Sequence, residues 1–244
     1  TQANYLSSTD GVTVVGQPST RVAWLQFNTI NGDSPVNDLK VRQALNYAID
    51  RDSLIAGVLD GYAVKVASIS TPEYDDYDAS VQGYTYDPEK AKSLLAEAGY
   101  ANGLTIKFMY PTVALCENLA AALKEAYKAV GVTLELVPME YSAYGAAVYL
   151  GNYETAFVEW QAVPYNPPLD YNLYFISTGS LNYCRVKNEW IDAKAAEASR
   201  TMDKAARSAI YVELNTYIRE QAYYNVLCGL VGNYVFNSHV KGYE

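Results

Sequence analysis

Residues 38–51, DLKVRQALNYAIDR, give the clearest local signal in this sequence. The apolar residues of the stretch recur at helical spacing, at Val41, Ala44, Leu45 and Ala48. This spacing predicts a short helix with one buried face, and Asp38 is placed to cap its first turn. A second short helix is expected over residues 52–59. We expect Arg42, Asp50 and Arg51 to lock the two helices together by ion pairs and caps rather than to contact a ligand.

Residues 86–100, YDPEKAKSLLAEAGY, predict another amphipathic helix. Asp87 is its expected cap, and Pro88 falls in the first turn, where a missing N–H costs nothing. Gly99 is a typical residue for ending a helix. The expected buried stripe consists of Ala91, Leu94, Leu95 and Ala98.

The central part of the chain alternates between strand and helix patterns. Strands are expected at residues 104–110, 132–139 and 153–160, with helices at 114–130 and 142–150. This alternation predicts a parallel sheet with right-handed crossovers.

The outer segments have weaker patterns. Residues 22–28 alternate like a half-buried strand, residues 63–84 are expected to form a long surface loop, and residues 163–169 a Pro-rich loop. Two helices over 188–200 and 203–217 and a strand over 225–236 complete the chain. No repeat or linker is evident. The expected fold is therefore one α/β domain over residues 1–244, with a mixed, mostly parallel sheet flanked by helices.

Composition excludes several classes of protein. The chain has 244 residues, 50% of them hydrophobic, and a net charge of −9. This content favours a folded core over disorder, and the acidic balance disfavours nucleic acid and anionic membrane surfaces as partners. No apolar stretch approaches the roughly 20 residues of a membrane helix. Residues 1–10 lack the features of an export signal, which alone favours the cytoplasm, although the chain also begins as though within a longer protein.

The residues able to bind metals are few and scattered. Cys116, Cys184 and Cys228 have no spacing typical of a metal site, so neither a metal nor a cofactor is expected. We expect buried free thiols; in an exported protein a Cys184–Cys228 disulfide is the alternative.

The 24 tyrosines, against 5 phenylalanines, suit surfaces and clefts that are apolar at the ring and wet at the hydroxyl. Compositional drift explains them equally well.

The two helical motifs resemble, in order and spacing, those of the family 5 extracellular solute-binding proteins, which include the oligopeptide and dipeptide receptors of bacterial ABC importers. Further similarity lies in FVEW at residues 157–160, followed by a loop with Pro and Asn, in an Asp-x-x-x-Arg helix start at Asp203, and in VKGY at residues 240–243.

The resemblance implies a type II periplasmic-binding-protein fold with two lobes that close on a ligand. Family members are about twice this long, so the chain is similar to a C-terminal lobe whose N-terminal lobe is absent. The implied partners are a peptide or other small-molecule ligand, that N-terminal lobe and an ABC permease. The implied location is extracellular or periplasmic, with a membrane anchor on the full-length lipoprotein.

The resemblance also indicates where a ligand lies. In open α/β sheets, ligands bind beyond the carboxyl ends of the strands. In the family, the Trp at the end of the third of these strands walls the ligand pocket, and Trp160 has the corresponding place. Candidates in the following loop and helix start, and at the other strand ends, are Tyr165, Asn166, Tyr171, Tyr110 and Tyr141. A core position for Trp160 and ordinary surface positions for the others are the structural alternatives.

One departure from the family affects ligand identity. In its peptide-binding members an Asp three residues after this Trp pairs with the peptide's amino group, and here that position is Val163. A buried ammonium needs a counter-charge. Either Glu159 or Asp170 substitutes, or the ligand has no free amine, as for the nickel chelates, sugars, haem and modified peptides that other members bind.

An enzyme is not expected. His239 is the only imidazole and lies near a polar chain end, and no nucleophile elbow is present. A lobe that feeds a membrane sensor instead of a transporter is the second alternative, and both functions need the same cleft.

Overall fold

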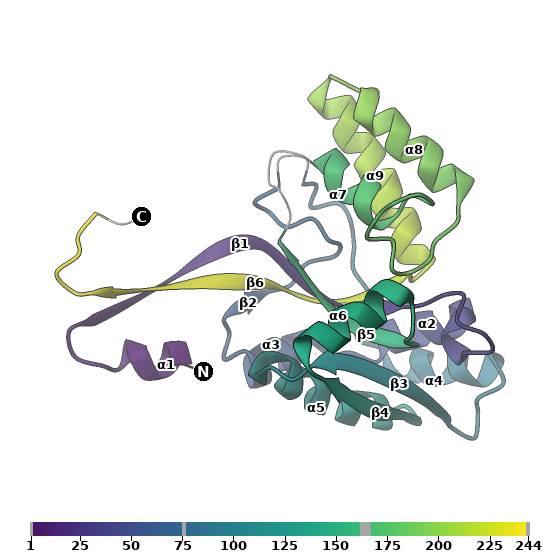
Figure 1. Cartoon of the computed structure of the whole chain (residues 1–244), viewed down its shortest axis with the longest axis horizontal. Coiled ribbons are helices and arrows are strands. Elements are labelled where there is room, and N and C mark those ends of the chain that lie inside the picture. Colours follow the sequence, from purple (N-terminus) through teal and green to yellow (C-terminus); the bar gives the residue numbers. More distant parts are fainter. Residues whose placement is uncertain (1, 75–76, 162–166, 243–244) are drawn as a thin grey trace.

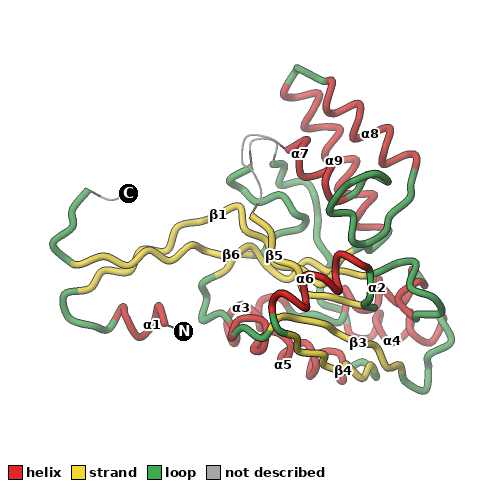
Figure 2. The backbone as a smooth tube through the Cα atoms, in the orientation of Figure 1, coloured by secondary structure: helices red, strands yellow, loops and turns green. Residues whose placement is uncertain are grey.

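The computed structural model describes residues 2–74, 77–161 and 167–242. It consists of one sheet with helices on both faces and a long two-stranded ribbon that projects from it (Figures 1 and 2). The strands are β1 (Val12–Phe27), β2 (Ala63–Val64), β3 (Leu104–Pro111), β4 (Val132–Met139), β5 (Thr155–Gln161) and β6 (Tyr224–Asn237). The helices are α1 (Gln2–Ser7), η1 (Pro35–Asn37), α2 (Leu39–Tyr47), α3 (Arg51–Val58), α4 (Pro88–Glu97), α5 (Ala114–Lys128), α6 (Tyr141–Leu150), α7 (Pro167–Tyr174), α8 (Glu189–Arg200) and α9 (Lys204–Glu220). Every predicted helix, and every predicted strand from β3 onward, is confirmed to within a few residues.

The sheet is mixed, with the order β2-β6-β1-β5-β3-β4. The parallel unit predicted for the central strands is confirmed, since β3 pairs in parallel with both β4 and β5. The expectation of a mostly parallel sheet is wrong, because β1 is antiparallel to β5 and β6, and β2 is antiparallel to β6. The chain enters the fold along β1 and leaves along β6 on the same side (Figure 1), which requires opposite strand directions. Hydrophobic patterning carries no information on strand direction.

The inner half of β1 is buried on both faces of the sheet. Ala23, Leu25 and Phe27 face the core formed with α2–α5, whereas Val22 and Trp24 face the core formed with α7–α9. The expectation of a half-buried strand is therefore wrong. Its polar residue Gln26 is 1% exposed, and its amide donates to the Tyr153 hydroxyl at 2.8 Å. A buried polar group of this kind is tolerated because it is hydrogen-bonded.

Two predicted loops differ from expectation. The segment expected as a surface loop contains β2 and then runs inward, since Ile69 and Thr71 are 2% and 0% exposed. The Pro-rich loop predicted over residues 163–169 is helical from Pro167, where α7 begins. Prolines in a first turn do not oppose a helix, because those N–H groups have no intrahelical acceptor.

The two arginines of the first motif join distant segments. Asp38 and Asp50 cap α2 and α3, as predicted. The predicted ion pairs are wrong. The buried Arg42 guanidinium donates to the carbonyls of Val36, Asn37, Gln221 and Ala222. Arg51 Nε donates to the carbonyl of Val226 at 2.7 Å, and its Nη2 donates to Asn225 Oδ1 at 2.7 Å. A guanidinium suits such clusters because its N–H groups point in fixed directions. The two side chains therefore hold α2 and α3 against the start of β6.

The three cysteines are buried, as predicted, and carry free thiols, so the Cys184–Cys228 disulfide does not form. Burial raises the pKa of each thiol to about 12. Among the described residues, no helix has the length and apolar character needed to cross a membrane, and no cluster of His, Cys, Asp and Glu is suited to hold a metal ion.

Candidate functional site

Trp160 lies near the end of β5, opposite Val22 of β1. Its ring is half-buried and packs against the core beneath α7–α9. The indole N–H donates to Asp170 Oδ1 at 2.8 Å. This hydrogen bond joins β5 to α7 and fixes the direction of the ring.

Tyr174 fixes the inner edge of the same indole. Its ring meets Trp160 edge-on, with centroids 5.3 Å apart, and meets Trp24 in the same way at 5.5 Å. Edge-to-face packing of this kind adds to the free energy gained from burial alone. Because Asp170 and Tyr174 are one helical turn apart on α7, the helix presents both to Trp160. The half-exposed ring is thus held rigidly, which suits a wall of a binding site.

Glu159 is the neighbouring carboxylate on β5. It pairs with Arg21 of β1, whose Nε donates to Glu159 Oε1 at 2.8 Å. The two side chains are 27% and 39% exposed. Successive side chains of a strand point to opposite faces, so Glu159 lies across the sheet from Trp160.

Asp170 is the other carboxylate considered as a partner for a ligand amine. It is 0% exposed, and one of its oxygens accepts the Trp160 indole N–H. Both carboxylates are therefore already engaged by a donor within this chain, Glu159 by a guanidinium and Asp170 by the indole.

The other predicted contact residues are dispersed. Tyr171 is 1% exposed, stacks on Tyr211 with centroids 4.7 Å apart and donates its hydroxyl to Asn215 Oδ1 at 2.8 Å. Tyr110 is also buried, at 6%, in the core beside α5. Both therefore serve the core in this structure. Tyr141 is 71% exposed at the start of α6. Tyr165, Asn166 and Val163 lie outside the described residues.

Strand register explains why these positions do not meet. Met109 of β3 pairs with Ala156 of β5, so Tyr110 is level with residue 157. Trp160 lies three residues further along, or about 10 Å at the rise of a strand. β5 runs past the end of β3 because it continues its pairing with β1. The prediction that all strand ends form one edge did not allow for this extension.

Sequence reasoning did not identify Arg21 and Tyr174 as neighbours of this site. Arg21 reaches Glu159 through an antiparallel pairing between segments 138 residues apart, which leaves no local pattern. Tyr174 had a usable signal, because the spacing from Asp170 to Tyr174 is one helical turn. The two prolines of the segment obscured that helix.

Comparisons with known proteins agree with this architecture. The model of the family described as bacterial extracellular solute-binding proteins, family 5 Middle, matches residues 1–182. The chain belongs to this family.

The relatives are all longer than this chain. It is 31% identical to the heme-binding protein A of Haemophilus influenzae over 95% of this chain and 43% of that protein. It is 28% identical to the dipeptide-binding protein of Escherichia coli, over 95% of this chain and 44% of that protein. Among solved structures, the periplasmic binding protein DppA of Helicobacter pylori, in complex with the peptide STSA, has a TM-score of 0.90 and 26% identity over 100% of this chain and 48% of that chain. The chain thus spans less than half the length of these relatives, which have the fold of type II periplasmic binding proteins.

Proposed function

We propose that this chain is the C-terminal lobe of a receptor that captures a peptide or related small solute between two lobes and delivers it to an ABC permease. Membership of the solute-binding family carries the proposal. Relatives of this chain are described as heme-binding, dipeptide-binding, glutathione-binding and oligopeptide-binding proteins, and the oligopeptide-binding protein of Escherichia coli is described as periplasmic. The receptor acts outside the cytoplasm, is anchored to the membrane as a lipoprotein and performs no reaction on the solute.

The projecting ribbon supports the two-lobed arrangement. The outer part of β1 pairs with the outer part of β6, from Val12 opposite Asn237 to Pro18 opposite Val231. These outer residues are mostly exposed or half-buried, unlike the inner part of either strand. A ribbon of this length beyond the core is suited to pack against a second lobe.

Trp160 is the ligand-contacting residue that we propose on this lobe. Its ring is half-exposed at the edge of the core formed with α7–α9, in which most of the aromatic rings are buried. An indole fixed by a hydrogen bond to Asp170 and by the packed ring of Tyr174 loses little entropy when a ligand stacks on it.

The test is a thermal-shift screen of the full-length protein with peptides, glutathione conjugates, haem and oligosaccharides. A solute present at about 100 times its dissociation constant stabilises the protein by ~2.7 kcal/mol. Trp160→Ala should reduce the affinity for the solute found by at least about tenfold, the loss expected for a buried aromatic contact. Trp190→Ala is the matched control, since Trp190 is 38% exposed on α8 and packs against the ring of Tyr217. Equal affinities of the two variants for the solute would show that Trp160 does not contact it. Chemical turnover of a compound without stable binding would refute the receptor function.

A further inference from the structure

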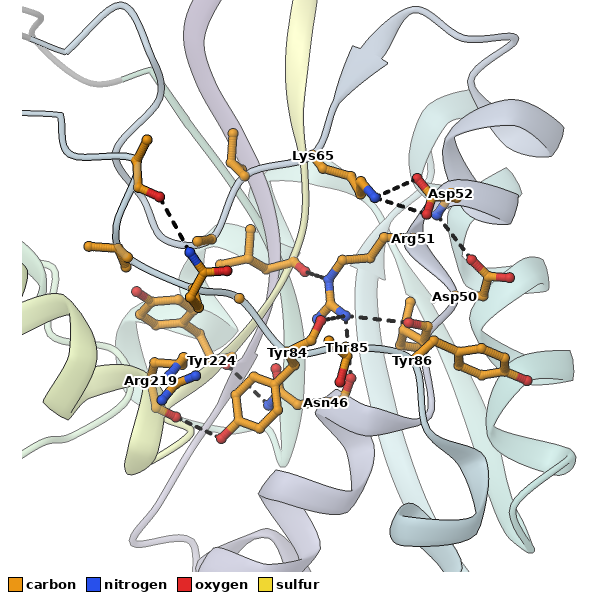
Figure 3. A pocket seen from close by; sticks show the side chains of 18 of the residues that line it. Asn46, Asp50, Arg51, Asp52, Lys65, Tyr84, Thr85, Tyr86, Arg219 and Tyr224 are labelled. Carbon is orange, nitrogen blue, oxygen red and sulfur yellow. Dashed lines mark hydrogen bonds and ion pairs between the residues drawn. The ribbon is translucent and has the colours of Figure 1, made fainter.

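A cavity of about 420 Å³ lies away from the Trp160 cluster. It is lined by the junction of α2 and α3, the first residues of β6, Arg219 of α9 and residues within 65–67 and 77–86 (Figure 3). Trp160, Asp170 and Tyr174 do not contribute to its lining. Its volume falls within the range of small-molecule sites in proteins.

Arg51 lies on the wall of this cavity and is 9% exposed. Its guanidinium donates to backbone carbonyls and to Asn225 Oδ1, and no carboxylate contacts it among the described residues. Burial lowers the pKa of Arg51 to about 10, so the group is still charged at neutral pH. Among the described residues its Nη2 has one acceptor, Asn225 Oδ1, which leaves an N–H donor for a further group.

Arg219 contributes a second guanidinium to the same cavity. It lies over the ring of Tyr84, at 5.8 Å from the centroid, and the Tyr84 hydroxyl donates to the Arg219 carbonyl at 2.7 Å. Its ion pair is with the adjacent Glu220 at 3.7 Å, a side chain that is 57% exposed. An exposed pair at this distance neutralises little of its charge.

The carboxylates around the cavity are already engaged. Asp50 accepts the N–H groups of the first turn of α3 and the Ser53 hydroxyl. Asp52 pairs with Lys65 at 2.9 Å. Three cationic side chains, Arg51, Lys65 and Arg219, line the cavity against two anionic ones, Asp50 and Asp52, so the charged lining carries a net charge of +1. Because Lys65 pairs with Asp52, the two guanidinium groups are the cationic donors that remain for an anion.

We propose that this cavity is a second binding site, separate from the interlobe cleft, which takes a small molecule through a phosphate or carboxylate group held by Arg51 and Arg219. Guanidinium groups recognise such oxyanions through paired N–H donors, and the interaction strengthens when the group is withdrawn from water. The rings of Tyr84 and Tyr86 supply apolar surface for the remainder of the ligand.

The test uses the full-length protein, titrated calorimetrically with inorganic phosphate and, separately, with citrate. Arg219→Gln removes one guanidinium and should weaken binding about tenfold, whereas Arg219→Lys should have a smaller effect because it retains the charge and loses the paired donors. Lys128→Gln, on the exposed side of α5, removes the same charge elsewhere and should change nothing. Arg51 is left intact because its side chain holds the start of β6.

Binding of either anion with this pattern supports the site, and the preferred probe identifies the oxyanion as phosphate or carboxylate. Absence of binding to both overturns the proposal. So does equal weakening by Arg219→Gln and Lys128→Gln, which would indicate a general charge effect. Loss of anion binding in Trp160→Ala would place the anion in the interlobe cleft and also overturn it.

Discussion

At the scale of single residues, two buried arginines stabilise the fold through hydrogen bonds to distant segments, which the motif around them does not reveal. Arg42 and Arg51 are 5% and 9% exposed and donate to carbonyls near the start of β6. Both positions were recognised as structural from the sequence. The carbonyls that they reach near the start of β6 were not, because these lie 175 to 180 residues away and are backbone oxygens that any sequence supplies.

Substitution of Arg42 by Met should therefore destabilise the chain. The change removes the guanidinium donor from four carbonyl acceptors in a buried environment. Hydrogen bonds from charged donors contribute about 1.5–3 kcal/mol each. We expect a loss of about 3 kcal/mol in the free energy of unfolding measured with urea. Lys124→Met, at an exposed position of α5, is the control and should change the value by less than about 0.5 kcal/mol. Similar small losses for both would mean that Arg42 has no such role.

The thiol of Cys184 predicts a dependence of stability on alkaline pH. Burial raises its pKa to about 12, whereas an unfolded thiol titrates near 8.5. The folded state holds the proton more tightly, so this contribution is fully present below about pH 8.5 and is lost as the pH rises toward 12. Between pH 8 and 9.5 the wild-type chain should lose ~1 kcal/mol more stability than Cys184→Ala. Parallel losses in urea unfolding would contradict the assignment.

At the scale of elements, caps explain why the short helices are located correctly. Asp50 accepts from the backbone N–H groups of Asp52 and Ser53, both at 3.1 Å. Asp50→Ala should cost about 1–2 kcal/mol of unfolding free energy. Asp52→Ala, in the same turn, removes an exposed pair with Lys65 and should cost less than about 1 kcal/mol. The reverse order, measured by urea unfolding, would assign the stabilising role to the ion pair.

The same elements mark what the sequence could predict. Helical spacing, caps and glycine stops are local, so the position of α2–α6 followed from them. Strand partners are not local. The extension of β1 to Val12, the antiparallel pairing of β1 with β5 and β6, and the burial of both faces around Gln26 all depend on segments far apart in the chain.

The candidate site shows the same difference between what local sequence predicts and what depends on distant segments. Trp160 was selected through the resemblance and is a half-exposed ring near the end of its strand. Tyr171 was selected for its place beside the Pro-rich loop, but the helical turn of α7 directs it into the core against Tyr211. Several other tyrosines, among them Tyr127 and Tyr224, are also core residues. Their hydroxyls were taken as a sign of a wet cleft, and for these residues that interpretation is wrong.

At the scale of the whole molecule, the sheet and its two helical layers form a body from which the β1–β6 ribbon extends (Figure 2). The chain covers 43–44% of the heme-binding and dipeptide-binding relatives. In the proposed receptor, the ribbon and the Trp160 side of the sheet face the second lobe. Closure of that lobe would exclude water from the ligand and provide the remaining contacts.

The most direct measurement is calorimetric titration of the solute that co-purifies with the full-length receptor, against both that receptor and the 244-residue chain, with circular dichroism to confirm that the chain is folded. We predict that the chain alone binds at least about a hundredfold more weakly, since half of the contacts and the closure are missing. Equal affinity of the folded chain and the full-length receptor would contradict a ligand site shared by two lobes.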